Sequence, residues 1–98
     1  MPRKLDPRDI EISLQQLHAD WSTNEQADHI QRRFRFDSYL QTVAFANAVA
    51  WIAQQENHHP QITIEYHSCL VDYSTHSVDG LSELDFHCAG TIDGLVNH

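Results

Sequence analysis

The chain has 98 residues, 41% of them hydrophobic and 20% charged, which is typical of one globular domain over residues 1–98 and not of a disordered or membrane-spanning chain. Fourteen acidic side chains against six basic ones give a net charge of −8, and such a surface repels the phosphates of nucleic acids. The polar N-terminal segment has no signal-peptide pattern and the two cysteines form no Cys-x-x-Cys pair, so we expect buried thiols and a cytoplasmic protein.

The first third of the chain predicts a helix followed by strands. Asp6 and Pro7 are typical of a helix start, because aspartate caps free backbone N–H groups and proline suits the first helical position. Apolar side chains then recur at helical spacing, at Ile10, Leu14 and Leu17. They predict a helix over 7–19. Alternation with a period of two predicts a strand over 30–36, with a weaker partner strand at 21–23.

A wide apolar stripe predicts a second, longer helix over 39–55. Asp37 or Ser38 provides its N-cap, and no glycine or proline interrupts it. Asn57 is a plausible end signal, and Pro60 cannot continue a helix. Because the stripe is wide, we expect this helix to be the most buried one.

Two alternating runs follow, 62–66 and 69–73. They predict a β-hairpin with a tight turn near 67–68, although no Asn-Gly or Asp-Gly pair fixes its register. We expect residues 75–80 to form a loop.

The last helix is predicted from a capping box, in which Ser82 and Asp85 accept hydrogen bonds from each other's backbone N–H groups. Its helically spaced apolar and thiol side chains are Leu84, Cys88, Ile92 and Leu95. The predicted order is helix, strand, strand, helix, strand, strand, helix. Hairpins separated by helices predict an α+β fold, an antiparallel four-stranded sheet with three helices packed on one face.

Three histidines lie where predicted elements meet. His58 and His59, followed by the stiff Pro60, join the long helix to the first hairpin strand, and such junctions commonly form pocket rims. His76 follows the second hairpin strand, whose end returns to the start of the first. We therefore expect the three imidazoles to converge. The alternatives are a solvated loop that happens to hold two histidines, and a strand-end histidine that faces water.

Asp85 has two compatible interpretations. In the first helical turn its carboxylate stabilises the helix dipole, and it can also orient a neighbouring histidine. We expect Tyr66 and Tyr73 to be packing residues. The remaining histidines are expected to be surface residues: His18, His29, His67, His87 and His98.

A metal site is a further alternative, since zinc takes three or four nitrogen, sulfur or oxygen ligands. His58, His59 and His76 could supply three. Adjacent histidines in an extended chain point to opposite sides, and no His-x-His or HExxH pattern is present, so we expect no metal.

Several blocks together resemble a known family. They are His58-His59-Pro60, then Ser74-Thr75-His76, then Gly80-Leu81-Ser82-Glu83 with Asp85, preceded by Phe34-Arg35-Phe36-Asp37-Ser38-Tyr39 before the long helix. No block is specific alone. In this order and spacing they resemble the pterin-4a-carbinolamine dehydratases over nearly the whole chain.

The resemblance implies loss of water from a 4a-hydroxytetrahydropterin, giving the quinonoid dihydropterin in tetrahydrobiopterin recycling. Hydroxide leaves poorly, so an acid must protonate the C4a hydroxyl while a base removes the N5 proton. By resemblance, His58 and His76 are the proton-transfer pair, His59 binds and orients the pterin with a share in proton transfer, and Asp85 supports them. Substrate-binding roles fall to Pro60, Ser74 and Thr75. The resemblance implies no metal or organic cofactor, and a homodimer or homotetramer.

Three positions depart from the family pattern. Gln54 stands where many members have an acid, Ile62 where many have tryptophan, and Leu84 where many have a basic residue. These departures keep a second function open: a catalytically weak member that binds a pterin or interacts with another protein.

Overall fold

The structure is a computed structural model that describes residues 2–96. Its helices are α1 (Pro7–Gln15), α2 (Tyr39–Glu56) and α3 (Glu83–Asp93), and η1 (His76–Val78) is a short 3-10 helix. Its strands are β1 (Ser22–Thr23), β2 (Ile30–Arg35), β3 (Gln61–Ile64) and β4 (Ser68–Tyr73). The predicted α+β fold is confirmed, with the predicted order of helices and strands.

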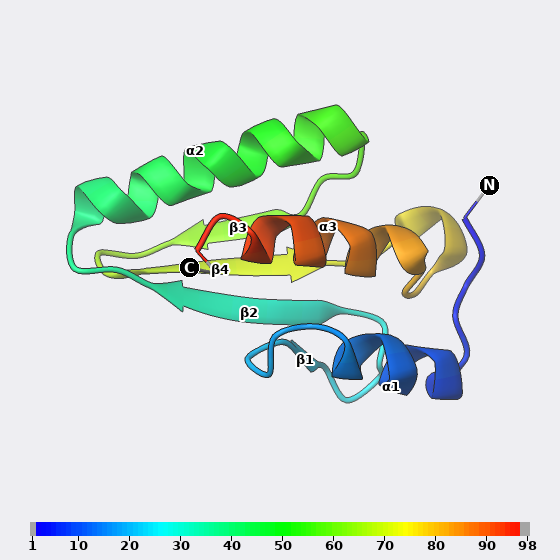
Figure 1. Cartoon of the computed structure of the whole chain (residues 1–98). Helices are drawn as coiled ribbons and strands as arrows, with labels where there is room; N and C mark the ends of the chain where they lie inside the picture. Colours follow the sequence, from blue (N-terminus) through cyan, green and yellow to red (C-terminus); the bar gives the residue numbers. More distant parts are fainter. Residues whose placement is uncertain (1, 97–98) are drawn as a thin grey trace.

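The four strands form one antiparallel sheet in the order β1-β2-β4-β3 (Figure 1). The helices lie over one side of this sheet, so alternate side chains of each strand face them. In the central strand β4, Val71 and Tyr73 are fully buried on the helix side, whereas Leu70 and Asp72 on the other side are half-buried. The antiparallel order brings the end of β4 between the starts of β2 and β3.

The hairpin turn differs from the predicted one. β3 ends at Ile64, and the Glu65 N–H donates to the Ser68 carbonyl over 2.8 Å, so the turn precedes Ser68 and the prediction at 67–68 was late. β4 begins at Ser68 because this residue already pairs with Arg35 of β2. A pairing with a strand from another part of the chain therefore decides where the hairpin turns.

The first helix is shorter than predicted. α1 ends at Gln15, four residues before the predicted end, and the Leu17 N–H donates three residues back to the Leu14 carbonyl. This tightening turns the chain so that Trp21 enters the core with 3% of its surface exposed. The segment predicted as a loop also contains η1.

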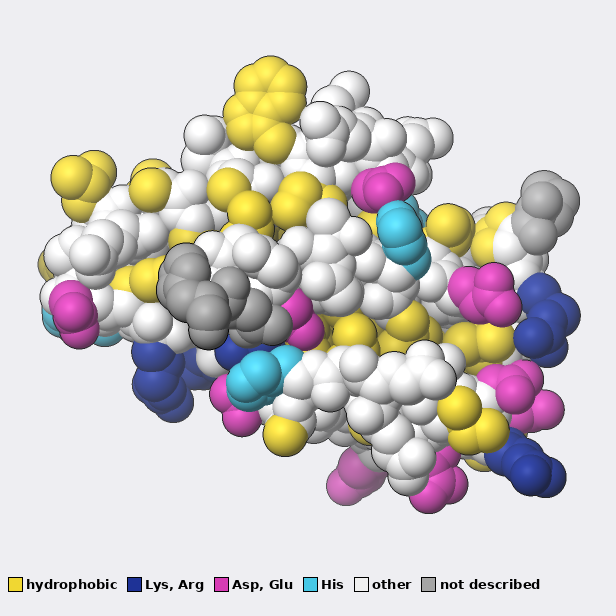
Figure 2. Space-filling model, in the orientation of Figure 1, with side chains coloured by type: hydrophobic (Ala, Val, Ile, Leu, Met, Phe, Trp, Pro, Cys, Tyr) yellow, Lys and Arg dark blue, Asp and Glu magenta, His cyan; other side chains and the backbone are white. Residues whose placement is uncertain are grey.

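The expectation that the long helix would be the most buried one was wrong. α2 buries six of its 18 residues, whereas α3 buries six of its 11. Only one side of α2 contacts the sheet and α3, and its other side leaves Leu40 and Trp51 79% and 65% exposed. Figure 2 shows hydrophobic side chains protruding along α2.

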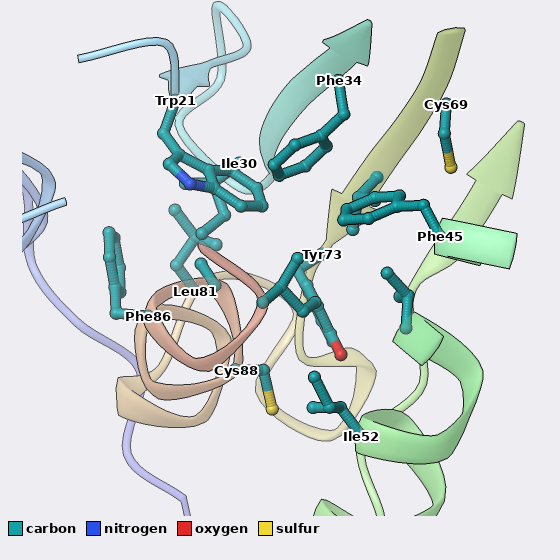
Figure 3. Packing of buried hydrophobic residues seen from close by; sticks show 14 of the residues in the cluster. Trp21, Ile30, Phe34, Phe45, Ile52, Cys69, Tyr73, Leu81, Phe86 and Cys88 are labelled. Carbon is teal, nitrogen blue, oxygen red and sulfur yellow. The ribbon is translucent and has the colours of Figure 1, made fainter. Parts of the chain in front are cut away.

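The core lies between the sheet and the helices. Figure 3 shows the Tyr73 side chain between Ile52 of α2 and Cys88 of α3. Both Cys69 and Cys88 are buried free thiols, as predicted, and burial raises the pKa of each. Among residues 2–96, none of the helices combines the length and the hydropathy of a transmembrane segment.

Candidate active site

The end of α2 places His58. Asn57 adopts a left-handed backbone conformation with φ 50° and ψ 42°, which reverses the chain direction, and the His58 N–H donates to the Ala53 carbonyl over 3.1 Å. Asparagine tolerates this conformation better than most residues. The imidazole then turns towards α3, where its Nε2 lies 2.6 Å from Oδ1 of Asp85.

Asp85 is fully buried at the start of α3, and its carboxylate accepts hydrogen bonds from three other residues. Its Oδ2 accepts from the Thr75 hydroxyl over 2.7 Å and from the Ser82 N–H over 3.0 Å. The Ser82 hydroxyl accepts from the α3 backbone, which completes the predicted capping box. One carboxylate therefore caps the helix and also contacts an imidazole.

The network also determines the tautomer of His58. A carboxylate accepts hydrogen bonds, so the imidazole donates through Nε2 and its Nδ1 is left without a proton in the neutral ring. The His58 side chain is 11% exposed and that of Asp85 is completely covered. Buried polar groups whose hydrogen bonds are satisfied are held rigidly, so the His58 ring stays in one orientation.

Tyr73, the last residue of β4, contacts the same imidazole from the sheet. Its ring stacks on the His58 ring with centroids 5.1 Å apart and planes 15° apart, and its hydroxyl donates to the His58 carbonyl over 3.1 Å. Burial is the main cause that raises the pKa of the Tyr73 phenol, so the hydroxyl remains a donor. The sequence indicated a packing residue, which is correct but incomplete. Its alternation with Val71 predicted the buried face, and nothing local predicted the contact with His58.

The other predicted site residues lie around this buried network. His59 is exposed, and Pro60 beside it is half-buried. His76 is exposed at the start of η1 and lines a small hollow of about 70 Å³ together with Ser74 and Thr75. Hydrogen bonds thus join His58, Thr75 and Asp85, whereas His59 and His76 lie at the surface.

One residue of this region was missed by the sequence analysis. His29 was expected to be a surface residue, but it lines the same hollow as His76, and its Nδ1 lies 2.6 Å from Oδ1 of Asp72. β2 begins with Ile30 opposite Tyr73, the last residue of β4, so the preceding His29 lies near the end of β4. Only the order of the strands could have predicted this.

Among residues 2–96, no group of three or more histidine, cysteine, aspartate or glutamate side chains is arranged to hold a metal ion. Four histidines each lie close to a single carboxylate: His18, His29, His58 and His87.

The fold and these pairs define a small α+β protein with histidine–carboxylate pairs at one end of its sheet. Residues 3–95 match the family described as pterin 4 alpha carbinolamine dehydratase. The match covers nearly the whole chain, and the chain therefore belongs to this family.

Individual relatives agree with the family match. A Nitrosomonas eutropha protein named "Putative pterin-4-alpha-carbinolamine dehydratase" is 46% identical over 88 residues, which cover 90% of this chain and 76% of that protein. A Legionella pneumophila (strain Corby) protein of the same name is 42% identical over 92 residues, covering 94% of this chain and 81% of that one.

Two solved structures share the fold. The transcriptional coactivator/pterin dehydratase from Brucella melitensis superposes with a TM-score of 0.91 at 25% identity, covering 97% of this chain and 100% of that one. A pterin dehydratase-like protein described as a RuBisCO assembly factor in the alpha-carboxysome gives a TM-score of 0.69 at 27% identity, covering 82% of this chain and 93% of that one.

Proposed function

We propose that this chain is a 4a-hydroxytetrahydrobiopterin dehydratase. It removes water from the C4a hydroxyl and N5 hydrogen of its substrate and releases quinonoid dihydrobiopterin, which supports tetrahydrobiopterin recycling in the cytoplasm. One residue donates a proton to the departing hydroxyl and another accepts the N5 proton, so the chemistry needs only acid–base groups.

His58 and His76 are the proposed proton-transfer pair. The tautomer held by Asp85 leaves Nδ1 of His58 free to accept the N5 proton, which gives His76 the acid role. His59 orients the pterin and shares in proton transfer. The pterin is also contacted by Pro60, Ser74 and Thr75. The observation that carries the proposal is the buried His58–Asp85 pair in a chain of this family, because a held imidazole needs no rearrangement before it accepts a proton.

A coupled assay tests this function. The 4a-hydroxy compound is generated in situ, and its dehydration is followed with wild type, His76→Ala and the control His67→Ala, which alters an exposed histidine of the hairpin turn. We expect wild type to accelerate the reaction, His76→Ala to lose about 10²–10⁴-fold, and His67→Ala to match wild type. A folded wild type without acceleration would reject the dehydratase, and full activity in His76→Ala would reject the site.

A second function is a pterin-binding or protein-interaction module with little activity. The unusual Gln54, Ile62 and Leu84 favour it, and structural relatives described as a coactivator and an assembly factor show that such names occur within the fold. Binding of tetrahydrobiopterin by calorimetry without turnover would support this second function.

We further propose that this single domain acts as a homodimer or homotetramer. Large hydrophobic side chains are exposed along α2 and the hairpin: Tyr39, Leu40, Trp51, Ile64 and Tyr66. Large apolar side chains gathered on a surface commonly mark a protein–protein interface. Light scattering is expected to give a dimer or tetramer mass that falls to the monomer in Leu40→Glu/Trp51→Glu. A wild-type monomer would contradict the proposal.

A further inference from the structure

The hollow beside His76 is lined in part by residues that have no role in the proposed proton transfer. It lies where the start of β2, the end of β4 and η1 meet. Its lining residues are Asp28, His29, Ser74, Thr75, His76, Asp79 and Gly80. Its volume of about 70 Å³ is small beside the roughly 300–1,000 Å³ of pockets that enclose whole ligands. The hollow therefore suits one substituent of a ligand and not a bicyclic ring.

His29 is held in one orientation within this lining. Its Nδ1 contacts Oδ1 of Asp72 over 2.6 Å, so Nδ1 carries the proton and Nε2 is left free to bind a ligand. The backbone is fixed as well, because Oδ1 of Asn24 accepts from the N–H groups of Asp28 and His29, each over 3.0 Å. With 39% of its side chain exposed, His29 is both ordered and accessible.

The chemistry of the lining indicates what it would bind. Asp28 and Asp79 contribute carboxylates, Ser74 a hydroxyl and His29 a free nitrogen, so acceptors predominate. Apart from the histidines, no lining residue can carry a positive charge, and the chain has a net charge of −8. A neutral group that donates hydrogen bonds, such as a hydroxyl, fits this lining, whereas a phosphate or carboxylate is repelled.

The position of His76 connects the hollow to the reaction. In the pterin ring C4a, N5 and C6 are consecutive atoms, so a substituent on C6 lies close to the C4a hydroxyl. A residue that protonates that hydroxyl therefore stands next to the C6 substituent. His76 has this role in the proposed function and also lines the hollow.

We propose that the hollow is a subsite for a hydroxylated C6 side chain of the pterin, and that His29, positioned by Asp72, makes the chain prefer neutral hydroxylated pterins. This inference rests on the proposed dehydratase function. It assigns a specificity role to a pair of residues outside the proton-transfer groups.

The test compares two substrates that differ only in this substituent. The 4a-hydroxy forms of tetrahydrobiopterin, with two side-chain hydroxyls, and of 6-methyltetrahydropterin, with none, are assayed with wild type, His29→Ala, Asp72→Asn and the control His67→Ala. We expect the ratio of kcat/KM for the hydroxylated over the methyl substrate to fall about tenfold in His29→Ala, mainly through KM, because the lost contact is present in ground and transition states alike. Asp72→Asn is expected to shift the ratio in the same direction but less, and His67→Ala to leave it unchanged.

Each outcome bears on one proposal. An unchanged ratio in His29→Ala overturns the subsite, and so does an equal loss for both substrates, because that would indicate a structural or chemical role. Thermal melting shows that the variant is folded. If wild type dehydrates neither substrate, the proposed function fails while the subsite is still tested, by calorimetric binding of tetrahydrobiopterin and 6-methyltetrahydropterin to wild type and His29→Ala. Equal relative affinities in both proteins would then overturn it.

Discussion

Two histidine–aspartate pairs near one end of the sheet, His58–Asp85 and His29–Asp72, have equal lengths and opposite surroundings. In each, a ring nitrogen lies 2.6 Å from a carboxylate oxygen. The His58 and Asp85 side chains are 11% and 0% exposed, whereas those of His29 and Asp72 are 39% and 23% exposed. The buried pair joins α2 to α3 through a carboxylate that also caps a helix. The accessible pair joins the start of β2 to β4 across the open side of the sheet.

The difference teaches that burial, and not distance, decides what such a pair does. An accessible pair contributes about 0–1 kcal/mol, because water solvates both groups well when they separate. Removing one partner of a buried hydrogen-bonded pair costs about 1–5 kcal/mol, because the group that remains stays in the interior without its partner. The buried pair should therefore matter for stability and geometry, and the accessible pair for contacts with a ligand.

The largest expected effect is that of Asp85→Ala, with a loss of about 3–5 kcal/mol in the free energy of unfolding. Three donors lose their acceptor together, those of His58, Thr75 and the Ser82 backbone. Urea unfolding followed by tryptophan fluorescence measures it, beside the matched Asp72→Ala, which is expected to lose no more than about 1 kcal/mol. Equal losses in the two variants would contradict the comparison. Asp85→Asn, of the same size, serves if Asp85→Ala does not fold.

The histidine side of each pair should show a smaller difference of the same sign. His58→Ala leaves a buried carboxylate with one donor fewer and is expected to lose about 1–3 kcal/mol, whereas His29→Ala should lose less than about 1 kcal/mol. The same unfolding titrations at low and high salt distinguish them further. Salt screens accessible charges strongly and buried ones weakly, so a salt-sensitive loss in His58→Ala would argue against its burial.

Tyr73→Phe isolates one hydrogen bond of the buried pair. The ring keeps its stacking on His58, and only the hydroxyl that donates to the His58 carbonyl is lost. We expect a loss of about 1 kcal/mol in the free energy of unfolding. Ser77→Ala is the control, because it removes the hydroxyl of an exposed residue. A loss of the same size in Ser77→Ala would refute the role of the Tyr73 hydroxyl.

The smallest expected effect is a loss of protein stability at alkaline pH, caused by buried groups that lose a proton there. Burial raises the pKa of the Cys88 thiol and of the Tyr73 phenol. The folded protein holds these protons more tightly than the unfolded chain. Stability is therefore fully present below the unfolded pKa of cysteine, about 8.5, and declines as the pH rises beyond it. Urea midpoints from pH 7 to 10 should fall less steeply in Cys88→Ala, and an identical slope would contradict this assignment.

Much of the fold could be predicted because its signals are local. The caps at Asp6 and Ser38, the capping box of Ser82 with Asp85, and the alternation in the strands all act within about four residues along the chain. The predicted element boundaries were wrong where a contact between residues far apart in the sequence determines the structure. α1 ends before the predicted residue, and the chain beyond it places Trp21 in the core, where its indole N–H donates to Asp93 over 2.9 Å.

The candidate site likewise has a part that local sequence signals predicted and a part that they did not. The sequence by itself indicated His58, His59 and His76 at chain junctions and Asp85 at a helix start. Only the tertiary structure decided that Asp85 contacts His58, that Tyr73 supports it, and that His29 lines the hollow beside His76. The physical reason is separation along the chain. His29 and Asp72 are 43 residues apart, and they meet only because β2 pairs with β4 across the centre of the sheet.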